Sequence, residues 1–297
     1  MSAGDSRMTH SSELREWIGG VIAEFVLTSP ENTMWGHGVE KAWSAPLVGF
    51  ARGDDPLFEE FKHRVGPFHW TPAEIFNAAF PETKAAGSDL TVISFVLPQT
   101  DVTKEDNRTE TKFPAERWAR TRVFGEEVNV KLRSHIVSSC SARGIQSVAP
   151  SDSPLWSWQT SERYGFASNW SERHVAYASG LGTFGLCDGL ITARGKAMRV
   201  GSVVARVAIP PTPRPYKDFR EYCLHFSGNG CDVCARRCPA DAISDRGHDK
   251  MKCFEYLAAK VVPHVKANFG FEGYGCGLCQ TAVPCESGIP LVSREHS

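Results

Sequence analysis

Apolar residues recur at helical spacing in two long stretches of the chain. The first stretch runs from a possible N-cap at Ser12 to Phe25. The second lies within 115–144 and carries one apolar side chain every four residues: Phe124, Val128, Leu132, Ile136 and Cys140. Because such spacing places side chains on one face of a helix, we expect two long amphipathic helices, the second ended by Gly144 as its C-cap.

Short apolar and β-branched runs predict the strands. The strongest run is 90–97, which Pro98 ends, and weaker runs cover 45–51 and 145–149. The runs 190–192 and 200–209 are expected to pair as a hairpin. The remaining predictions are a helix over 56–65, helices capped by Thr71 and by Ser171, and an exposed polar loop over 101–111.

These elements predict a mixed α+β domain over residues 11–212 and a second domain over 213–297. The boundary is placed at the proline-rich segment 210–215, which should form a stiff linker. Residues 1–10 are small and polar and are expected to be a disordered tail. A chain of 297 residues is long enough for one large core and one small module.

Cysteine is concentrated in the second domain, which holds eight of the ten cysteines: Cys223, Cys231, Cys234, Cys238, Cys253, Cys276, Cys279 and Cys285. The C-x2-C-x3-C-P run that begins at Cys231 matches the last three cysteines of a bacterial ferredoxin motif. The first cysteine of that motif would fall at Gly228, and Cys223 is its nearest substitute.

Eight thiolates are the number that two [4Fe–4S] clusters require. The crossed ferredoxin pattern predicts one ligand set made of Cys223, Cys231, Cys234 and Cys285. It predicts a second set made of Cys238, Cys253, Cys276 and Cys279. Two zinc sites would also use eight cysteines, but usually as C-x2-C pairs without the x3-C-P extension. Disulfides are the other alternative and suit small secreted chains.

The composition excludes few classes of protein. The chain is 41% hydrophobic and 23% charged, with a formal net charge of -1, so it has no bias toward nucleic acid or membranes. No apolar run reaches the ~18 residues that a membrane helix needs. The first residues include no apolar signal region and no twin arginine. Clustered thiols in this context predict a cytoplasmic protein.

A resemblance to a known family rests on three motifs that precede the cysteines. They are Ser171-Glu-Arg-His-Val-Ala-Tyr-Ala-Ser-Gly-Leu-Gly-Thr-Phe-Gly185, Gly189-Leu-Ile-Thr192 and Arg199-Val-Gly-Ser202. In this order, and followed by the cysteines, they resemble the epoxyqueuosine reductase and reductive dehalogenase superfamily over much of the chain. Glycines at this spacing also fit a dinucleotide-binding loop, but they follow a predicted helix rather than a strand, which argues against it.

The resemblance implies a nitroreductase-like domain that binds base-off cobalamin and a ferredoxin-like module that supplies it with electrons. It further implies a small organic substrate and an external low-potential donor such as ferredoxin or flavodoxin. Close approach of glycine to a flat ring is the physical reason for the loop 180–185. The implied cofactor-binding residues are Gly180, Gly182, Thr183, Phe184, Gly185, Cys187, Leu190, Ile191, Thr192, Met198, Arg199, Gly201 and Ser202. Cys187 has the alternative of an ordinary buried thiol.

The sequence departs from this family at the expected proton donors. The family's aspartate position falls near Phe166, and its tyrosine position falls near Val128 and Asn129. Five residues separate the last two cysteines, where the family usually has three. Replacement proton donors are Tyr164, Glu172 and His174, each of which has a structural alternative: packing, an ion pair or a hydrogen bond.

A second hypothesis is an electron-transfer iron–sulfur protein without a corrinoid, whose large domain binds flavin or serves as a docking domain. A third is a structural zinc protein. The domain of about 200 residues that precedes the linker argues against a bare ferredoxin, because electron transfer alone does not need it.

Overall fold

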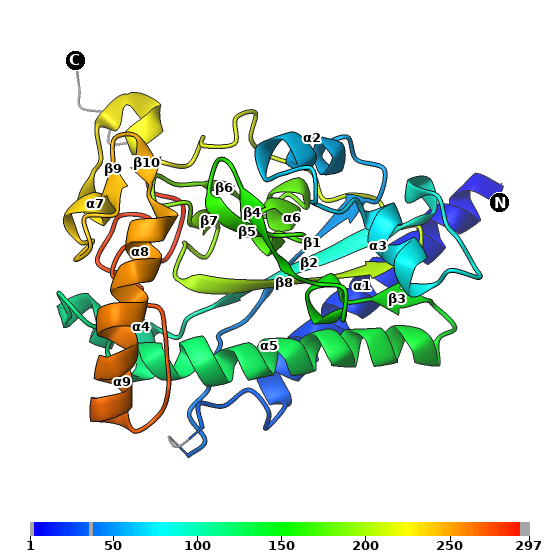
Figure 1. The fold of residues 1–297 in the computed structure, drawn as a ribbon. Helices are drawn as coiled ribbons and strands as arrows, with labels where there is room; N and C mark the ends of the chain where they lie inside the picture. The colour runs from blue at the N-terminus through cyan, green and yellow to red at the C-terminus, as the bar shows by residue number, and fades with distance from the viewer. Residues whose placement is uncertain (1–2, 36–37, 292–297) are drawn as a thin grey trace.

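A four-stranded antiparallel sheet lies at the centre of the protein, in the strand order β1-β2-β8-β3 (Figure 1). The computed structural model describes residues 3–35 and 38–291, and side chains from residue 11 onward. The strands of this sheet are β1 (Leu47–Arg52), β2 (Thr91–Pro98), β8 (Met198–Ala205) and β3 (Ser147–Val148). The three predicted strand segments thus all form strands, and β2 is buried along its whole length.

Helices cover both faces of this sheet because β2 is apolar on both faces. Ile93, Phe95 and Leu97 pack in one core with α1 and α5, whereas Val92 packs in a second core with α2, α3 and α6. The result is a three-layer arrangement (Figure 1). The covering helices are α1 (Ala3–Thr28), α5 (Glu116–Ala142), α2 (Leu57–Arg64), α3 (Pro72–Ala79) and α6 (Glu172–Ala178).

The helix termini follow the predicted signals at Thr71 and Gly144, whereas the predicted cap at Ser171 is wrong. Thr71 caps α3 through a capping box, in which its hydroxyl accepts from the Glu74 N–H at 3.3 Å and Glu74 accepts from the Thr71 N–H at 2.7 Å. Gly144 follows α5 with a φ of 71°, the left-handed conformation that suits a glycine there. Ser171 precedes α6, but its hydroxyl bonds the ring of His174 instead of capping the helix.

The stretch 101–111 was predicted to be a loop, and this is wrong: α4 spans Asp101–Thr109. Thr100 caps it, and its buried face is polar, consisting of Thr103, Lys104 and Asn107. No hydrophobic period therefore marked the helix. Asn107 donates from Nδ2 to the Cys276 carbonyl at 3.3 Å and to the Thr281 hydroxyl at 3.0 Å, so α4 holds the last cysteine-bearing segment.

The predicted hairpin of 190–192 with 200–209 is also wrong. β7 (Leu190–Thr192) pairs with β6 (Gly182–Phe184), while β8 lies between β2 and β3 in the main sheet. A long β-branched strand gains more by pairing in the centre of the sheet than with a three-residue neighbour. The first helix also differs from expectation, because α1 begins at Ala3 and includes residues predicted to be disordered.

The proline-rich segment is bound to the sheet rather than free. The N–H of Thr212 donates to the Phe50 carbonyl at 2.8 Å, and the N–H of Phe50 donates to the Thr212 hydroxyl at 3.0 Å. Arg15 of α1 donates to the Pro210 carbonyl at 2.5 Å. The segment therefore runs along the outer edge of β1. It joins the two parts of the chain without separating them.

The cysteine-rich part contains short elements only and lies at one end of the molecule, beside α4 and the beginning of α5 (Figure 1). Across the part of the chain that the structure describes, no helix is both long and apolar enough to cross a membrane. The remaining elements are η1 (Gly87–Asp89), η2 (Pro150–Asp152), β4 (Trp158–Ser161), β5 (Gly165–Ser168), η3 (His225–Asn229), α7 (Val233–Arg236), β9 (Ile243–Ser244), β10 (Gly247–His248), α8 (Lys250–Tyr256), η4 (Leu257–Val261) and α9 (Val262–Phe269).

Candidate functional site

Four cysteines that are far apart in the sequence line one narrow cavity. They are Cys223, Cys231, Cys234 and Cys285, the first predicted ligand set, and the ammonium-bearing side chain of Lys196 lines the same cavity. Cys234 lies on α7, and Cys285 reaches the cavity from the end of the chain. We refer to this space as the first thiol site.

The other predicted set gathers beside it. The thiol of Cys276 has Cys253 and Cys238 as electrostatic neighbours, and burial raises its pKa to about 11. Cys276 is in turn a neighbour of Cys279. The Cys238 sulfur accepts a hydrogen bond from the Ala242 N–H at 3.4 Å. We refer to these four residues as the second thiol site.

The thiols of the first site surround a space instead of meeting at a point. Within residues 3–35 and 38–291, no three His, Cys, Asp or Glu side chains converge closely enough to hold one metal ion. Zinc draws four sulfurs to about 2.3 Å from one centre. A cubane cluster binds each thiolate at a different corner, so its ligands surround a body. The four thiols of the first thiol site line a cavity between them.

Cys187 lies between the two thiol sites. It is buried, with 5% of its surface exposed, and it hydrogen-bonds with Cys234 of the first site and Cys279 of the second. These bonds lower the pKa of Cys187 and raise the pKa values of its two partners. The prediction that Cys187 contacts a corrin has no support in these contacts, because the thiol faces other sulfurs.

The glycines of the loop 180–185 have a different steric role from the one predicted. A Cβ on Gly180 would lie 2.8 Å from the Pro213 carbonyl oxygen, and one on Gly182 would lie 2.1 Å from the Ile191 carbonyl oxygen. Both glycines are thus needed for close packing of protein against protein. The predicted reason, room for a flat ring, is wrong for these two positions.

Most other predicted cofactor-binding residues are packed inside the protein. Thr183, Leu190, Ile191 and Thr192 are buried, and Phe184 packs against the ring of His174 at 4.8 Å. Gly185 lies against the side chain of Ile191. Among the β8 residues, Gly201 and Ser202 are also buried, whereas Met198 and Arg199 are half-buried; all four lie where β8 has no strand partner on its outer side.

That open edge exists because β3 is short. β3 pairs only with Val204 and Ala205, so within the described chain no strand continues the sheet beyond residues 198–203 of β8. α5 covers the edge with polar side chains, and Asn129 donates from Nδ2 to the Val200 carbonyl at 3.2 Å. We call this region the polar seam; its members are Arg122, Glu126, Asn129, Arg133, Asp152, Glu172, Arg199 and Ser202.

The polar seam contains buried hydrogen-bonding atoms that have no partner in the structure. They include Nη1 of Arg122, Oδ1 of Asn129 and Nε of Arg199. Buried groups of this kind are costly and commonly mark a ligand or water site. Arg122 also lies 4.3 Å from the ring of Tyr274, so the seam extends to the cysteine-rich part. Burial, together with the charge of Arg199, lowers the pKa of Arg122 to about 9.

Sequence reasoning missed the four members of the seam on α5, although a signal was present. Arg122, Glu126, Asn129 and Arg133 follow one another at spacings of three or four residues, which places them on one face of the helix. Asn129 lies where the family's tyrosine was expected. The same helix carries an apolar stripe and a polar stripe, and only the apolar stripe was predicted to be buried.

Glu172 is the predicted proton donor that belongs to the seam. Its two carboxylate oxygens accept hydrogen bonds from Ser151 and Ser202, both at 2.6 Å. Burial raises its pKa to about 7, even though nearby Arg133 and the two serine hydrogen bonds act in the opposite direction. A carboxyl group that titrates near neutrality is suited to proton transfer.

His174 lies apart from Glu172, although both are in α6. Its Nδ1 bonds the Ser171 hydroxyl at 2.8 Å, its ring packs on Phe61, and burial lowers its pKa well below the ordinary value. His69, a residue not singled out from the sequence, accepts from the Ser171 N–H at 3.1 Å. Burial lowers the pKa of His69 to about 4, so both imidazoles are neutral packing groups.

Tyr164 faces the cysteine-rich part of the chain. The Nζ of Lys250 lies 5.1 Å from the centre of its ring, and burial raises the pKa of its phenol. Burial also lowers the pKa of Lys250 to about 8. The structure thus separates the three predicted proton donors: Glu172 lies in the polar seam, Tyr164 lies beside Lys250, and His174 packs on Phe61.

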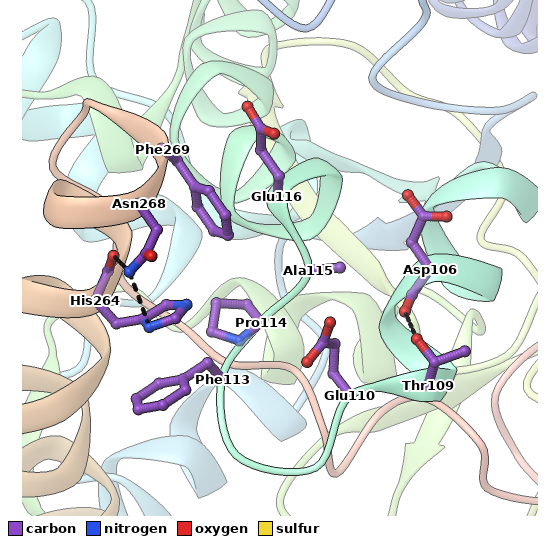
Figure 2. A pocket seen from close by; sticks show the side chains of 10 residues that line it. All are labelled: Asp106, Thr109, Glu110, Phe113, Pro114, Ala115, Glu116, His264, Asn268 and Phe269. Carbon is purple, nitrogen blue, oxygen red and sulfur yellow. Dashed lines mark hydrogen bonds between the residues drawn. The ribbon is translucent and has the colours of Figure 1, made fainter.

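A surface hollow has a lining that is separate from these sites. It lies between the α4–α5 connection and α9, where Phe113 stacks on His264 with ring centres 3.9 Å apart (Figure 2). Asp106, Glu110 and Phe269 complete its walls. It includes no cysteine and no predicted cofactor-binding or catalytic residue.

Comparison with solved structures reveals the same fold in epoxyqueuosine reductases. One such enzyme superposes with a TM-score of 0.52 and 16% identity over 95% of this chain and 68% of its own. The enzyme from Bacillus subtilis gives a TM-score of 0.51 and 15% identity over 97% and 68%. A third structure is of an epoxyqueuosine reductase with an epoxyqueuosine-modified tRNA stem loop. It superposes with a TM-score of 0.52 and 16% identity over 95% of this chain and 68% of its own.

The predicted resemblance is therefore confirmed at the level of the fold. A catabolic reductive dehalogenase superposes less well, with a TM-score of 0.48 over 82% of this chain and 30% of its own. No family model matches the sequence, and no curated protein is significantly similar to it. The fold class is mixed α/β, as in the epoxyqueuosine reductases, whereas the nitroreductase-like and ferredoxin-like descriptions remain predictions.

The raised pKa of Glu172 predicts a pH-dependent stability. The folded-state pKa of about 7 lies above the ordinary 4.5, so the protonated form favours folding, and this contribution is lost as pH rises from about 4.5 to 7. Glu172→Gln mimics the protonated form. We expect wild type and variant to match in free energy of unfolding at pH 5, and the variant to be more stable at pH 8 by on the order of 2 kcal/mol.

Urea unfolding at the two pH values measures this difference. The exposed Glu127→Gln on α5 is the matched control; it keeps Glu172 and should therefore follow the wild-type dependence of stability on pH. A difference between wild type and Glu172→Gln that stays constant from pH 5 to pH 8 would contradict a raised pKa at Glu172.

Proposed function

We propose that this chain is an iron–sulfur oxidoreductase that carries electrons through two [4Fe–4S] clusters to a base-off cobalamin, for the reduction of a small organic substrate. The observation that carries the proposal is the first thiol site. Its four cysteines, 223, 231, 234 and 285, are the set predicted from the crossed spacing, and one cavity joins them. The shared cavity supports the ligand set that the spacing predicts.

The neighbourhood of the thiols is consistent with two clusters. Each cluster needs four thiolates, and its sulfurs accept hydrogen bonds from N–H groups. The Ala242 N–H to Cys238 bond is one such donor. The two sets lie against each other, with Cys187 in contact with a member of each. Electrons can therefore pass between the two sites over a short path.

The polar seam is the part of the protein that we propose for cobalamin binding. The unpartnered atoms of Arg122, Asn129 and Arg199 can bond the amide groups that surround a corrin, and Met198 lies at the same end of β8. Cobalamin supplies a strongly reducing cobalt centre when bound. Glu172 would hold the proton that the reduction consumes, because its carboxyl titrates near neutrality in this seam. Gly180 and Gly182 have no part in this proposal.

The proposed partners follow from the same chemistry. An external low-potential donor, of the ferredoxin or flavodoxin kind, must reduce the clusters, and a cytoplasmic location would provide one. The net charge of -1 gives no general attraction to nucleic acid. The expectation of no nucleic-acid partner is nevertheless weakened, since one structure of the same fold holds a tRNA stem loop.

Iron analysis tests the ligand assignment. We expect eight iron and eight sulfide per chain after anaerobic reconstitution. Cys223→Ala should retain about half of both, because Gly228 cannot supply a thiolate in its place. The matched control is Cys140→Ala, a buried thiol of α5 that is remote from the cysteine-rich part. It should keep the full iron content and cost about 1 kcal/mol of stability.

Two results would contradict this assignment. Stoichiometric zinc in place of iron would remove the clusters altogether. Loss of a cluster in Cys140→Ala together with full retention in Cys223→Ala would show that the ligand sets are wrong.

One observation favours the second candidate function, an electron-transfer protein without a corrinoid. The loop 180–185, where the family resemblance implies the corrin, is packed against the protein's own backbone. In this alternative the large domain binds flavin or docks a partner, and the clusters alone carry the activity.

Equilibrium dialysis distinguishes the two candidates. We expect cobalamin to be retained at micromolar concentration, with its spectrum showing the base-off form. Asn129→Leu removes the unpartnered Oδ1 of the seam and should weaken retention at least tenfold while leaving the iron content unchanged. Asn268→Leu, an exposed asparagine of α9, is the control. Stoichiometric flavin and no cobalamin would favour the alternative.

A further inference from the structure

The turn between β7 and β8 is locked onto the last cysteine of the chain. The N–H of Lys196 donates to the Cys285 carbonyl at 2.9 Å. Gly195 precedes it with a φ of 77°, and a Cβ there would lie 2.0 Å from the Glu286 carbonyl oxygen. Only glycine allows this approach. The position of Lys196 is therefore set by the same segment that carries Cys285.

The side chain of Lys196 points into the first thiol site. It is 2% exposed, and its Nζ donates to the Cys187 sulfur at 3.3 Å. It also lines the cavity together with the four cysteines of that site. Burial alone would lower the pKa of Lys196, but neighbouring sulfurs raise it well above the ordinary value; they are Cys187, Cys285, Cys234 and Cys279.

A buried ammonium group beside a cluster acts on its reduction. Reduction adds one negative charge to a [4Fe–4S] cluster, and a nearby positive charge stabilises the product. The effect is large where water is excluded, because the local dielectric constant is low. Net charge and hydrogen bonds near the sulfurs are among the factors that set cluster potentials.

We propose that Lys196 raises the reduction potential of the cluster in the first thiol site above that of the cluster in the second. The inference rests on the proposed function, since it requires both clusters. One electron enters from the external donor and converts the oxidised cluster into its one-electron-reduced form. No proton moves, and Lys196 keeps its charge throughout. An electron that enters through the cluster of the second site is then more stable on the cluster of the first site.

Cys187 completes this arrangement as the anchor of Lys196. Its sulfur accepts the ammonium hydrogen bond and touches Cys234 of the first site and Cys279 of the second. It belongs to neither predicted ligand set. Cys187→Ser should therefore keep both clusters, whereas loss of a cluster in this variant would make Cys187 a ligand and overturn the arrangement.

Redox titration with dithionite, followed by electron paramagnetic resonance, tests the proposal. In Lys196→Met one of the two midpoint potentials should become more negative. The ratio of reduced to oxidised cluster at the wild-type midpoint should fall at least tenfold, which corresponds to about 59 mV for one electron. Lys196→Arg keeps the charge and should stay close to wild type.

Lys62→Met is the matched control for removing an ammonium group. Lys62 of α2 is half-buried, pairs with Glu74 at 2.7 Å and does not line the cavity. The midpoint potentials of both clusters in this control variant should equal those of wild type. Eight iron per chain with unchanged potentials in Lys196→Met would overturn this inference alone. Wild type without clusters would overturn the proposed function, and this inference with it.

A measurement on unmutated protein covers the case in which Lys196→Met does not fold. With ¹⁵N-labelled lysine, the reduced protein should show a nitrogen coupling to one cluster in its electron spin-echo modulation, and Lys196→Arg should lose it. Absence of a lysine coupling in reduced wild type would contradict the placement of the ammonium group beside a cluster.

Discussion

The docking of the last cysteine-bearing segment onto α4 is the interaction on which the site depends. Cys285 can share a cavity with Cys223 and Cys234 only if residues 276–287 are held in place. Asn107 bonds the Cys276 carbonyl, and Arg108 pairs with Glu286 at 2.8 Å. These contacts are polar and partly buried, so each has a specific geometry. Loss of either partner would leave a buried polar group unsatisfied, which costs free energy.

The same contacts connect the thiol sites with the sheet. Arg237, which precedes Cys238, donates to the Leu278 carbonyl at 3.0 Å and to the Asn107 carbonyl at 3.3 Å. α4 therefore joins the two cysteine-bearing segments to each other and to α5, with which it packs. Because α5 carries one side of the polar seam, the thiol sites and the seam belong to one rigid arrangement. This proximity is what an oxidoreductase needs if electrons are to reach a cofactor in the seam.

The sequence predicted the features that have a strong local signal. The apolar β2 and the stripe of α5 could be read from periodicity. The motif spacing predicted crossed cysteine sets, and the members of the first set line one cavity. The helix α4 could not be predicted from periodicity, because its buried face is polar. The partners of these polar side chains lie in a distant segment of the chain and are known only after folding. The role of Gly182 was misjudged for a related reason. A glycine signals close approach, but the approaching group, here the Ile191 carbonyl, is known only after folding.

An anomalous difference map at the iron absorption edge, from crystals grown without oxygen, tests the central claim most directly. The account predicts two separate iron peaks per chain. One should lie in the cavity lined by Cys223, Cys231, Cys234 and Cys285, and the other among Cys238, Cys253, Cys276 and Cys279. A single iron peak, or peaks that appear at the zinc edge instead, would contradict it.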